Sequence, residues 1–347
     1  MSAAAAGGQT RLALGMALGL AMAAGLPALG QPFRLPTANA ALFEPGGEAR
    51  YFVGTTGKPW TSGTFGCVRT EGQQFHEGID IRCVQRDAQG EPADVVVATA
   101  DGTVCYVNRR PSLSNYGKYL IVQHRVDGLE IYSLYAHLRD IRADLKPGTA
   151  VRAGEPLGWM GRTANTRERI TLERAHLHFE LNLLLNDRFA LWLKKTHPRE
   201  RNDHGDWNGR NLVGIDPAAV FWAQRLQGAQ FSLLRYLRQQ PALCRVWVAA
   251  TNFPWLVRYA PLVQPNSRAA QEGVAGYELA LAFNGLPFEV IPRAASELPP
   301  AKGTRVRLLW VNVTEAQARP CGHLVSRTGN RWTLTRRGLE LLDLLTF

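Results

Sequence analysis

The sequence has few cysteines and no paired cysteine motif. Its five cysteines are spread over 347 residues and none stands in a Cys-x-x-Cys pair, so a zinc site built from cysteine pairs is not expected. By position, Cys67 could pair with Cys83 and Cys244 with Cys321, which would leave Cys105 over. Spacing alone does not fix this connectivity.

Acidic residues are missing from the N-terminal region, where the first is Glu44. Arg11 is followed by a stretch rich in alanine, leucine and glycine, which resembles a secretory signal. We therefore predict that residues 1–30 are a removable signal peptide and that the protein acts in the periplasm or outside the cell. Small residues at 28–30 and 38–40 offer two cleavage points, and an uncleaved membrane anchor is the alternative.

Other absences narrow the class of protein. The sequence shows no internal repeat, no low-complexity tract after the signal and no later apolar run long enough to cross a membrane. With 46% hydrophobic and 20% charged residues, its composition is that of a globular protein. The net charge of +11 favours an anionic partner, but no nucleic-acid-binding motif accompanies it, so nucleic acid is not expected.

The pattern of strands and turns divides the chain into two β-rich parts. Residues 31–50 contain proline and glycine and read as a linker, and short strands punctuated by glycine fill residues 51–222. A connecting helix is predicted over residues 223–241, followed by a smaller β-rich domain over residues 242–347 that ends in a short helix. The predicted fold class is therefore mainly β, with an antiparallel sandwich or barrel-like sheet in the first domain.

Two β-hairpins are predicted within the first domain. A β-branched run at residues 94–100 is expected to pair with residues 103–107 across the turn Asp101-Gly102. A second pair joins residues 119–124 to residues 129–135 across Asp127-Gly128.

The first chemically informative segment contains His76, Gly78 and Asp80. On an extended strand all three residues face the same side. A straight strand would hold the Cα atoms of His76 and Asp80 about 13 Å apart, near the limit for two side chains that share one ion. We therefore expect a bend or bulge at Gly78.

Two later segments add three more histidines. His176 and His178 alternate with Leu177 and Phe179, which is the pattern of a strand with one apolar face, and His137 follows a strand at a turn. A lone histidine is usually a surface or satisfied core residue. Two histidines and one carboxylate, however, are the ligand set of a catalytic zinc ion with an open fourth position, and two histidines remain to act on bound water.

In their order along the chain, these motifs resemble the lysostaphin-type (LytM-like) zinc endopeptidases. That family carries His-x-x-x-Asp, Tyr-x-His and His-Leu-His-Phe-Glu in this order, with a glycine-rich series of strands between them. The resemblance covers about residues 70–220 and implies a fold of the duplicated hybrid motif type. The segments that carry it are residues 76–80, 101–104, 121–124, 135–138, 147–148, 154–158, 160–163 and 176–180.

The resemblance implies a role for each site residue. His76, Asp80 and His178 would hold one Zn²⁺ ion per chain, His176 would be the general base, and His137 would donate to the oxyanion or orient the water. Zinc lowers the pKa of bound water to about 7 and polarises a carbonyl, and imidazole titrates near neutrality, so it can move the proton. His124, at a strand position, is expected to be structural.

The resemblance also implies an activity, namely hydrolysis of peptide bonds in peptidoglycan stem peptides or cross-links. The alternative is a non-catalytic regulator of other wall hydrolases on the same scaffold. Relatives usually have a loop rich in glycine, serine and threonine before His-Leu-His-Phe-Glu, whereas this chain has the charged segment 167–174, which puts its substrate preference in doubt. The domain over residues 242–347 carries no recognised motif and could bind the wall, bind a regulatory protein or restrain the site.

Overall fold

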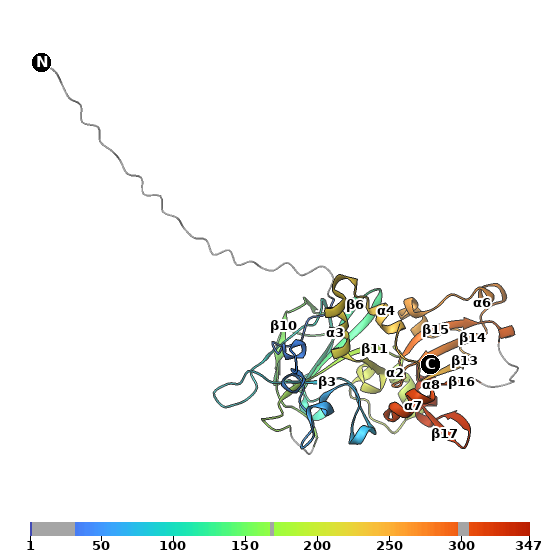
Figure 1. Cartoon of the computed structure of the whole chain (residues 1–347), viewed down its shortest axis with the longest axis horizontal. Helices are drawn as coiled ribbons and strands as arrows, with labels where there is room; N and C mark the ends of the chain where they lie inside the picture. The colour runs from blue at the N-terminus through green and yellow to red at the C-terminus, as the bar shows by residue number, and fades with distance from the viewer. Residues whose placement is uncertain (2–31, 167–169, 298–304) are drawn as a thin grey trace.

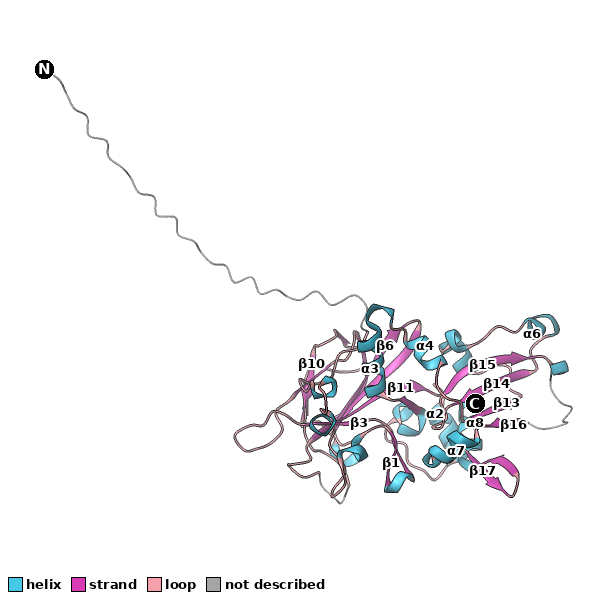
Figure 2. Ribbon diagram, in the orientation of Figure 1, coloured by secondary structure: helices cyan, strands magenta, loops and turns pink. Residues whose placement is uncertain are grey.

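The computed structural model describes the chain except for residues 2–31, 167–169 and 298–304. The predicted signal peptide therefore lies outside the described residues. Within the described residues, no helix combines the length and the apolar character that a membrane span requires. The protein is mainly β, as predicted, and its sheets are antiparallel (Figures 1 and 2).

The first domain is built on one large antiparallel sheet with the strand order β12-β11-β7-β6-β5-β9, and β3 pairs with β11. A smaller sheet with the order β4-β10-β8 and the hairpin β1-β2 complete it. The strands are β1 (Gly66–Arg69), β2 (Gln74–His76), β3 (Ile79–Arg82), β4 (Val95–Val97), β5 (Gly102–Asn108), β6 (Tyr119–Val126), β7 (Leu129–Ala136), β8 (Asp140–Ile141), β9 (Ala150–Val151), β10 (Pro156–Trp159), β11 (His176–Leu184) and β12 (Leu212–Ile215).

The C-terminal part contains a second antiparallel sheet with the order β15-β14-β13-β16, as the sequence predicted for this β-rich region. Its strands are β13 (Cys244–Val248), β14 (Gly276–Leu281), β15 (Pro287–Arg293) and β16 (Val306–Val311), and β17 (Val325–Thr328) pairs with β18 (Arg331–Leu334). The α-helices of the chain are α1 (Glu48–Tyr51), α2 (Phe189–Thr196), α3 (Pro217–Gln227), α4 (Leu233–Arg238), α5 (Pro254–Arg258), α6 (Ser267–Glu272), α7 (Val313–Ala318) and α8 (Arg336–Leu345).

One predicted hairpin forms and the other does not. β6 and β7 pair along their whole length across the turn at residues 127–128. β4, in contrast, pairs with β10, and β5 pairs with β6 and β9. The prediction of a hairpin over residues 94–107 was wrong because the chain turns away at Thr99, whose N–H donates to the Tyr135 hydroxyl at 2.8 Å and whose carbonyl accepts from Arg34 at 2.6 Å.

Residues 32–50 are part of the folded domain and not the linker that their composition suggested. Phe33 and Leu42 are buried in the core, and the backbone N–H of Phe33 donates to the Gln224 side chain at 2.8 Å. The predicted connecting helix over residues 223–241 is interrupted. α3 ends at Gln227 and is followed by Gly228, whose φ of 52° favours glycine, and α4 begins only at Leu233.

The described disulfide joins Cys67 to Cys321, so neither pairing suggested by position forms. Cys83 and Cys244 are free and buried, and Cys105 is free as well. The pairings predicted from sequence distance were wrong because β1, which carries Cys67, lies against the short 3₁₀ turn Pro320–Gly322 of the C-terminal part. The bond therefore ties the two halves of the chain together.

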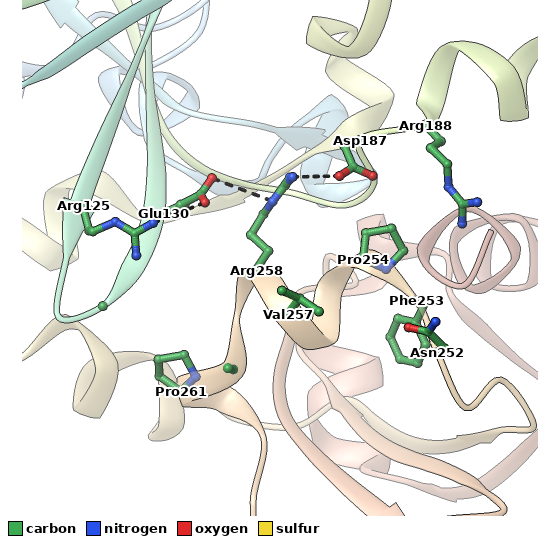
Figure 3. Close-up of a pocket in the computed structure, with 12 residues that line it drawn as sticks. Arg125, Glu130, Asp187, Arg188, Asn252, Phe253, Pro254, Val257, Arg258 and Pro261 are labelled. Atoms are coloured by element: carbon green, nitrogen blue, oxygen red, sulfur yellow. Dashed lines mark hydrogen bonds and ion pairs between the residues drawn. The ribbon is translucent and has the colours of Figure 1, made fainter.

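Polar contacts also join the two parts on the other side of the molecule. Arg258, at the end of α5, lies between the carboxylates of Asp187 and Glu130, at 3.1 Å and 3.8 Å (Figure 3). The Tyr259 hydroxyl accepts a hydrogen bond from the Leu184 N–H at 2.8 Å at the end of β11. The C-terminal part is thus attached directly to the strand that carries two of the predicted site histidines.

Candidate metal centre

His76 and Asp80 are brought together by a turn at Gly78. β2 ends at His76, β3 begins at Ile79, and β3 pairs with β11 so that Asp80 lies opposite His178. A Cβ atom at position 78 would lie 2.3 Å from the Phe179 carbonyl oxygen, so only glycine fits there. The predicted bend at Gly78 is confirmed.

β11 presents its two histidines to one side and its apolar residues to the other. His176 and His178 face the site, and Leu177 and Phe179 are fully buried in the core. His137 follows the neighbouring strand β7 with a φ of 61°, an uncommon conformation for a residue with a side chain. Its ring centroid lies 4.8 Å from that of His176, so all the predicted site residues converge.

Among the described residues, His76, Asp80 and His178 form a buried group whose ligand atoms are close enough to share one ion. His76 Nε2 lies 3.2 Å from Asp80 Oδ1, His178 Nδ1 lies 3.0 Å from the same oxygen, and the two nitrogens are 3.1 Å apart. Tetrahedral zinc with ligands at 2.0–2.1 Å requires edges of about 3.3 Å. The triangle fits such an ion.

The other nitrogen of each ring is held by a fixed partner. His76 Nδ1 lies 2.7 Å from the Thr64 carbonyl, and His178 Nε2 lies 2.8 Å from Glu180 Oε1. Two further ring nitrogens face backbone oxygens, His176 Nδ1 at 2.6 Å and His137 Nδ1 at 2.9 Å. Because a carbonyl or carboxylate accepts a hydrogen bond there, each ring in its neutral form has its lone pair directed into the site.

The electrostatics of the centre favour a cation. Asp80 and Glu180 are both buried, one on each side of His178. Burial opposes the ionisation of Asp80, but the rings of His76 and His176 and a hydrogen bond with His178 hold its pKa well below the usual range. Burial likewise opposes charge on His178, but hydrogen bonds to both carboxylates raise its pKa to about 9. Two buried carboxylates thus make a place where positive charge is stabilised.

Burial acts differently on the two remaining histidines. It lowers the pKa of His176 to about 4, against the opposing influence of Asp80. It also lowers the pKa of His137 well below its usual value, and the neighbouring rings of His176 and His178 act in the same direction. Burial thus favours the neutral form of both rings, which can accept a proton.

Two residues of the site were not predicted from the sequence. Arg69, on β1, donates to Asp80 Oδ2 at 2.8 Å and so fixes the carboxylate oxygen that is turned away from His178. The ring of Tyr116 lies 5.4 Å from that of His178, and its hydroxyl hydrogen-bonds to Glu180. No spacing in the sequence links Arg69 or Tyr116 to the histidine motifs, because only the folded chain places them side by side.

The centre lies in an open cleft with a volume of about 980 Å³. Asp80, His137, His176 and His178 line its floor, and residues 55–62 and 68–74 supply much of its walls. A cleft of this size is within the range of small-molecule and peptide sites.

Residues 74–188 match the family model described as peptidase family M23. No curated protein matches the chain in a search by sequence.

Solved structures that resemble the chain include a zinc-containing peptidase from Vibrio cholerae, with 27% identity, a TM-score of 0.22, and coverage of 31% of this chain and 26% of that one. The catalytic domain of the antimicrobial peptidase lysostaphin from Staphylococcus simulans is 23% identical, with a TM-score of 0.24 and coverage of 34% and 74%. A putative glycyl-glycine endopeptidase LytM from Ruminococcus gnavus is 23% identical, with a TM-score of 0.27 and coverage of 43% and 47%.

The chain spans about a quarter of the Vibrio peptidase and about half of the Ruminococcus protein. The match to the family model covers the segment that contains all five predicted site residues, from His76 to His178. The part of the chain that is similar to peptidase family M23 is therefore residues 74–188.

Proposed function

We propose that this protein is a zinc-dependent endopeptidase that hydrolyses peptide bonds in the stem peptides or cross-links of peptidoglycan. The observation that carries the proposal is the buried triangle of His76, Asp80 and His178, with edges of 3.0–3.2 Å, of which Asp80 and His178 line an open cleft. A structural zinc site would be closed by a fourth protein ligand, whereas a catalytic one keeps a position open.

In this proposal, zinc is held by His76 Nε2, Asp80 Oδ1 and His178 Nδ1. When bound there, zinc polarises the scissile carbonyl and lowers the pKa of water. Arg69 holds the second oxygen of Asp80, and Glu180 holds the far nitrogen of His178. These partners keep the ligands oriented in advance, which reduces the cost of assembling the site.

His176 is the proposed general base. Its Nδ1 faces the Arg174 carbonyl at 2.6 Å, so the acceptor lone pair is on Nε2, 3.5 Å from Asp80 Oδ1. A ring that is neutral at pH 7 can take a proton from the nucleophile at Nε2 and return it to the leaving amine.

The hydrogen bond of the His137 ring distinguishes between its two proposed roles, which are to orient the water and to donate to the oxyanion. Its Nδ1 faces the Thr163 carbonyl at 2.9 Å and burial keeps the ring neutral. A neutral ring that donates from Nδ1 can only accept at Nε2. This supports orientation of the attacking water by His137 over donation to an oxyanion.

We also propose that the protein acts outside the cytoplasmic membrane, in the periplasm or after secretion. Support comes from the described disulfide between Cys67 and Cys321, because such bonds persist in oxidising compartments. The net charge of +11 is suited to an anionic wall polymer.

The proposal is tested with purified residues 31–347 and isolated peptidoglycan, with and without a chelator, and identification of released products by mass. Zinc-dependent release of fragments with newly formed peptide termini is expected. Release that a chelator does not affect would contradict the zinc mechanism. Full zinc occupancy without any release would instead favour a non-catalytic regulator of other wall hydrolases.

A further inference from the structure

A second hollow adjoins the proposed peptide cleft and has no role in the mechanism above. Its volume is about 640 Å³, and it shares Glu77 and Tyr116 with the cleft as lining residues. Glu180, which holds the far side of His178, also lines it. The hollow therefore begins directly beside the metal centre.

The opposite wall of this hollow is helix α8 of the C-terminal part. Arg336, Arg337 and Leu341 of this helix line it. Because α8 belongs to the region after residue 242, the hollow is shared between the family M23 domain and the part of the chain outside it.

Helix α8 is fixed relative to the metal centre. The Asn186 side chain donates to the Leu344 carbonyl at 2.8 Å, and the Trp192 indole N–H donates to Asp343 at 2.7 Å. Leu342, Leu344 and Leu345 are buried. A helix attached in this way presents its exposed side chains at a set position, as a binding wall requires.

The C-terminal part is also tied to the wall of the catalytic cleft. The Cys67–Cys321 disulfide lies two residues before Arg69 on β1, and Arg69 lines the cleft and holds Asp80. The C-terminal part is thus attached to the first domain both at β1 and through α8.

Among the described residues that line the hollow, most charged side chains are paired, and the two exceptions are Glu77, on the side of the cleft, and Arg337, on α8. Arg336 pairs with Glu340 at 2.8 Å, and Arg210 pairs with Glu200. Arg337 is exposed and has no hydrogen bond or ion pair with any residue that the structure describes. This leaves a guanidinium on the α8 side of the hollow that is available to a ligand.

A guanidinium is suited to carboxylates because it offers planar paired donors. Stem peptides of peptidoglycan carry free carboxylates along a short chain. We propose that the hollow is a second peptide subsite, in which Arg337 binds a carboxylate of the stem peptide while another part of the substrate lies over the metal centre. This inference rests on the proposed function, whose substrate it specifies further.

The test compares two probes and two variants of the full-length mature chain. The probes are a fluorescein-labelled tetrapeptide, L-Ala-D-Glu-L-Lys-D-Ala, with free carboxylates, and the same peptide with its carboxylates amidated. The variants are Arg337→Glu and, as a matched control, Arg331→Glu, which makes the same charge change at an exposed position of β18 outside the hollow. Binding is measured by fluorescence anisotropy, and thermal unfolding verifies that both variants fold.

The wild-type protein is expected to bind the carboxylate probe about tenfold more tightly than the amidated one, the size expected for one charge-assisted contact. Arg337→Glu should remove this preference, and Arg331→Glu should keep it. An unchanged preference in Arg337→Glu, or an equal loss in both variants, would overturn the inference.

Because binding is measured without turnover, failure of this inference and failure of the proposed function can be told apart. A protein that binds in an Arg337-dependent way but releases nothing from peptidoglycan would keep the subsite and lose the peptidase assignment. A protein that cleaves peptidoglycan without any dependence on Arg337 would keep the activity and lose the subsite.

Discussion

The histidines of the candidate metal centre and the buried His124 of the large sheet differ in one respect. At the metal centre, each ring has one nitrogen bound to a carbonyl or carboxylate and the other directed toward Asp80 or the cleft. His124, on β6, has both nitrogens bound, one to the Asp101 carbonyl at 2.9 Å and the other to Ser133 Oγ at 2.6 Å. The Ser133 hydroxyl in turn contacts that of Tyr135 at 3.0 Å.

The difference shows that burial alone does not make a histidine functional. Burial lowers the pKa of His124 to about 4, much as it does for His176. The two rings differ in whether one ring nitrogen is free of a hydrogen bond to a fixed partner within the fold. At His124 none is left, so the ring stabilises the sheet. At His176 one remains and faces the cleft.

The largest effect is expected from removing a ligand. His178→Ala should abolish both zinc binding and turnover, because the remaining His76 and Asp80 leave the ion with two protein ligands where a catalytic site needs three. Zinc content after dialysis should fall from about one ion per chain to less than about a tenth of that. Retention of stoichiometric zinc would remove His178 from the ligand set.

A more selective loss is expected at the neighbouring histidine on the same strand. His176→Ala should lower turnover by about 100-fold or more, the usual contribution of a general base, and leave zinc content unchanged. Elemental analysis and a peptidoglycan release assay on the same preparation give the two quantities. If the zinc were lost as well, the assignment of His176 as base and not ligand would be wrong.

A smaller effect should follow from changing a partner of a ligand. Glu180→Gln keeps a hydrogen-bond acceptor for His178 Nε2 but removes the charge, and should weaken zinc affinity by about tenfold. Competition with a chromogenic chelator measures this. Asn182 is hydrogen-bonded to Glu180 at 2.7 Å, so Asn182→Ala is a milder control that leaves the carboxylate charge in place.

For His124, in contrast to the residues of the candidate site, we expect a substitution to change stability and not zinc binding. His124→Gln should lower the free energy of unfolding by about 1–3 kcal/mol, because buried partners lose hydrogen bonds, while zinc content and affinity stay the same. Denaturant unfolding of zinc-loaded protein at constant metal activity measures the change. If His124→Gln lost as much zinc affinity as Glu180→Gln, the distinction between His124 and the histidines of the candidate site would be wrong.

The pH dependence of this stabilisation tests the same comparison in another way. His124 has a pKa of about 4 when folded and an ordinary value of 6.5 when unfolded, so the unfolded chain binds more protons between these values. The stability that His124 contributes is therefore complete above pH 6.5 and lost as the pH falls toward 4. The stability difference between wild type and His124→Gln should narrow over this range, and a difference that is constant with pH would contradict the shift.

Much of the site could be predicted from local sequence because its residues alternate on strands. The spacing of His176 and His178, with Leu177 and Phe179 between them, indicates one polar and one apolar face, and Gly78 marks the turn that brings Asp80 toward His76. Such local patterns also predicted the β6–β7 hairpin and the final helix, which begins at Arg336. The same reasoning failed at Thr99, where contacts with Arg34 and Tyr135 outweigh the local turn signal.

The amino-acid sequence by itself determined the residue types of the candidate site, their faces on the strands and the mainly β class, because these depend on spacing of two and four residues. Only the tertiary structure decided that Cys67 pairs with Cys321, that Arg69 holds Asp80 and that α8 lines a hollow beside the metal centre. In each case the two residues or elements are far apart in the sequence and are brought together only by the packing of the folded chain. Periodicity in a sequence records which side of an element is buried, but it does not record which distant element covers that side.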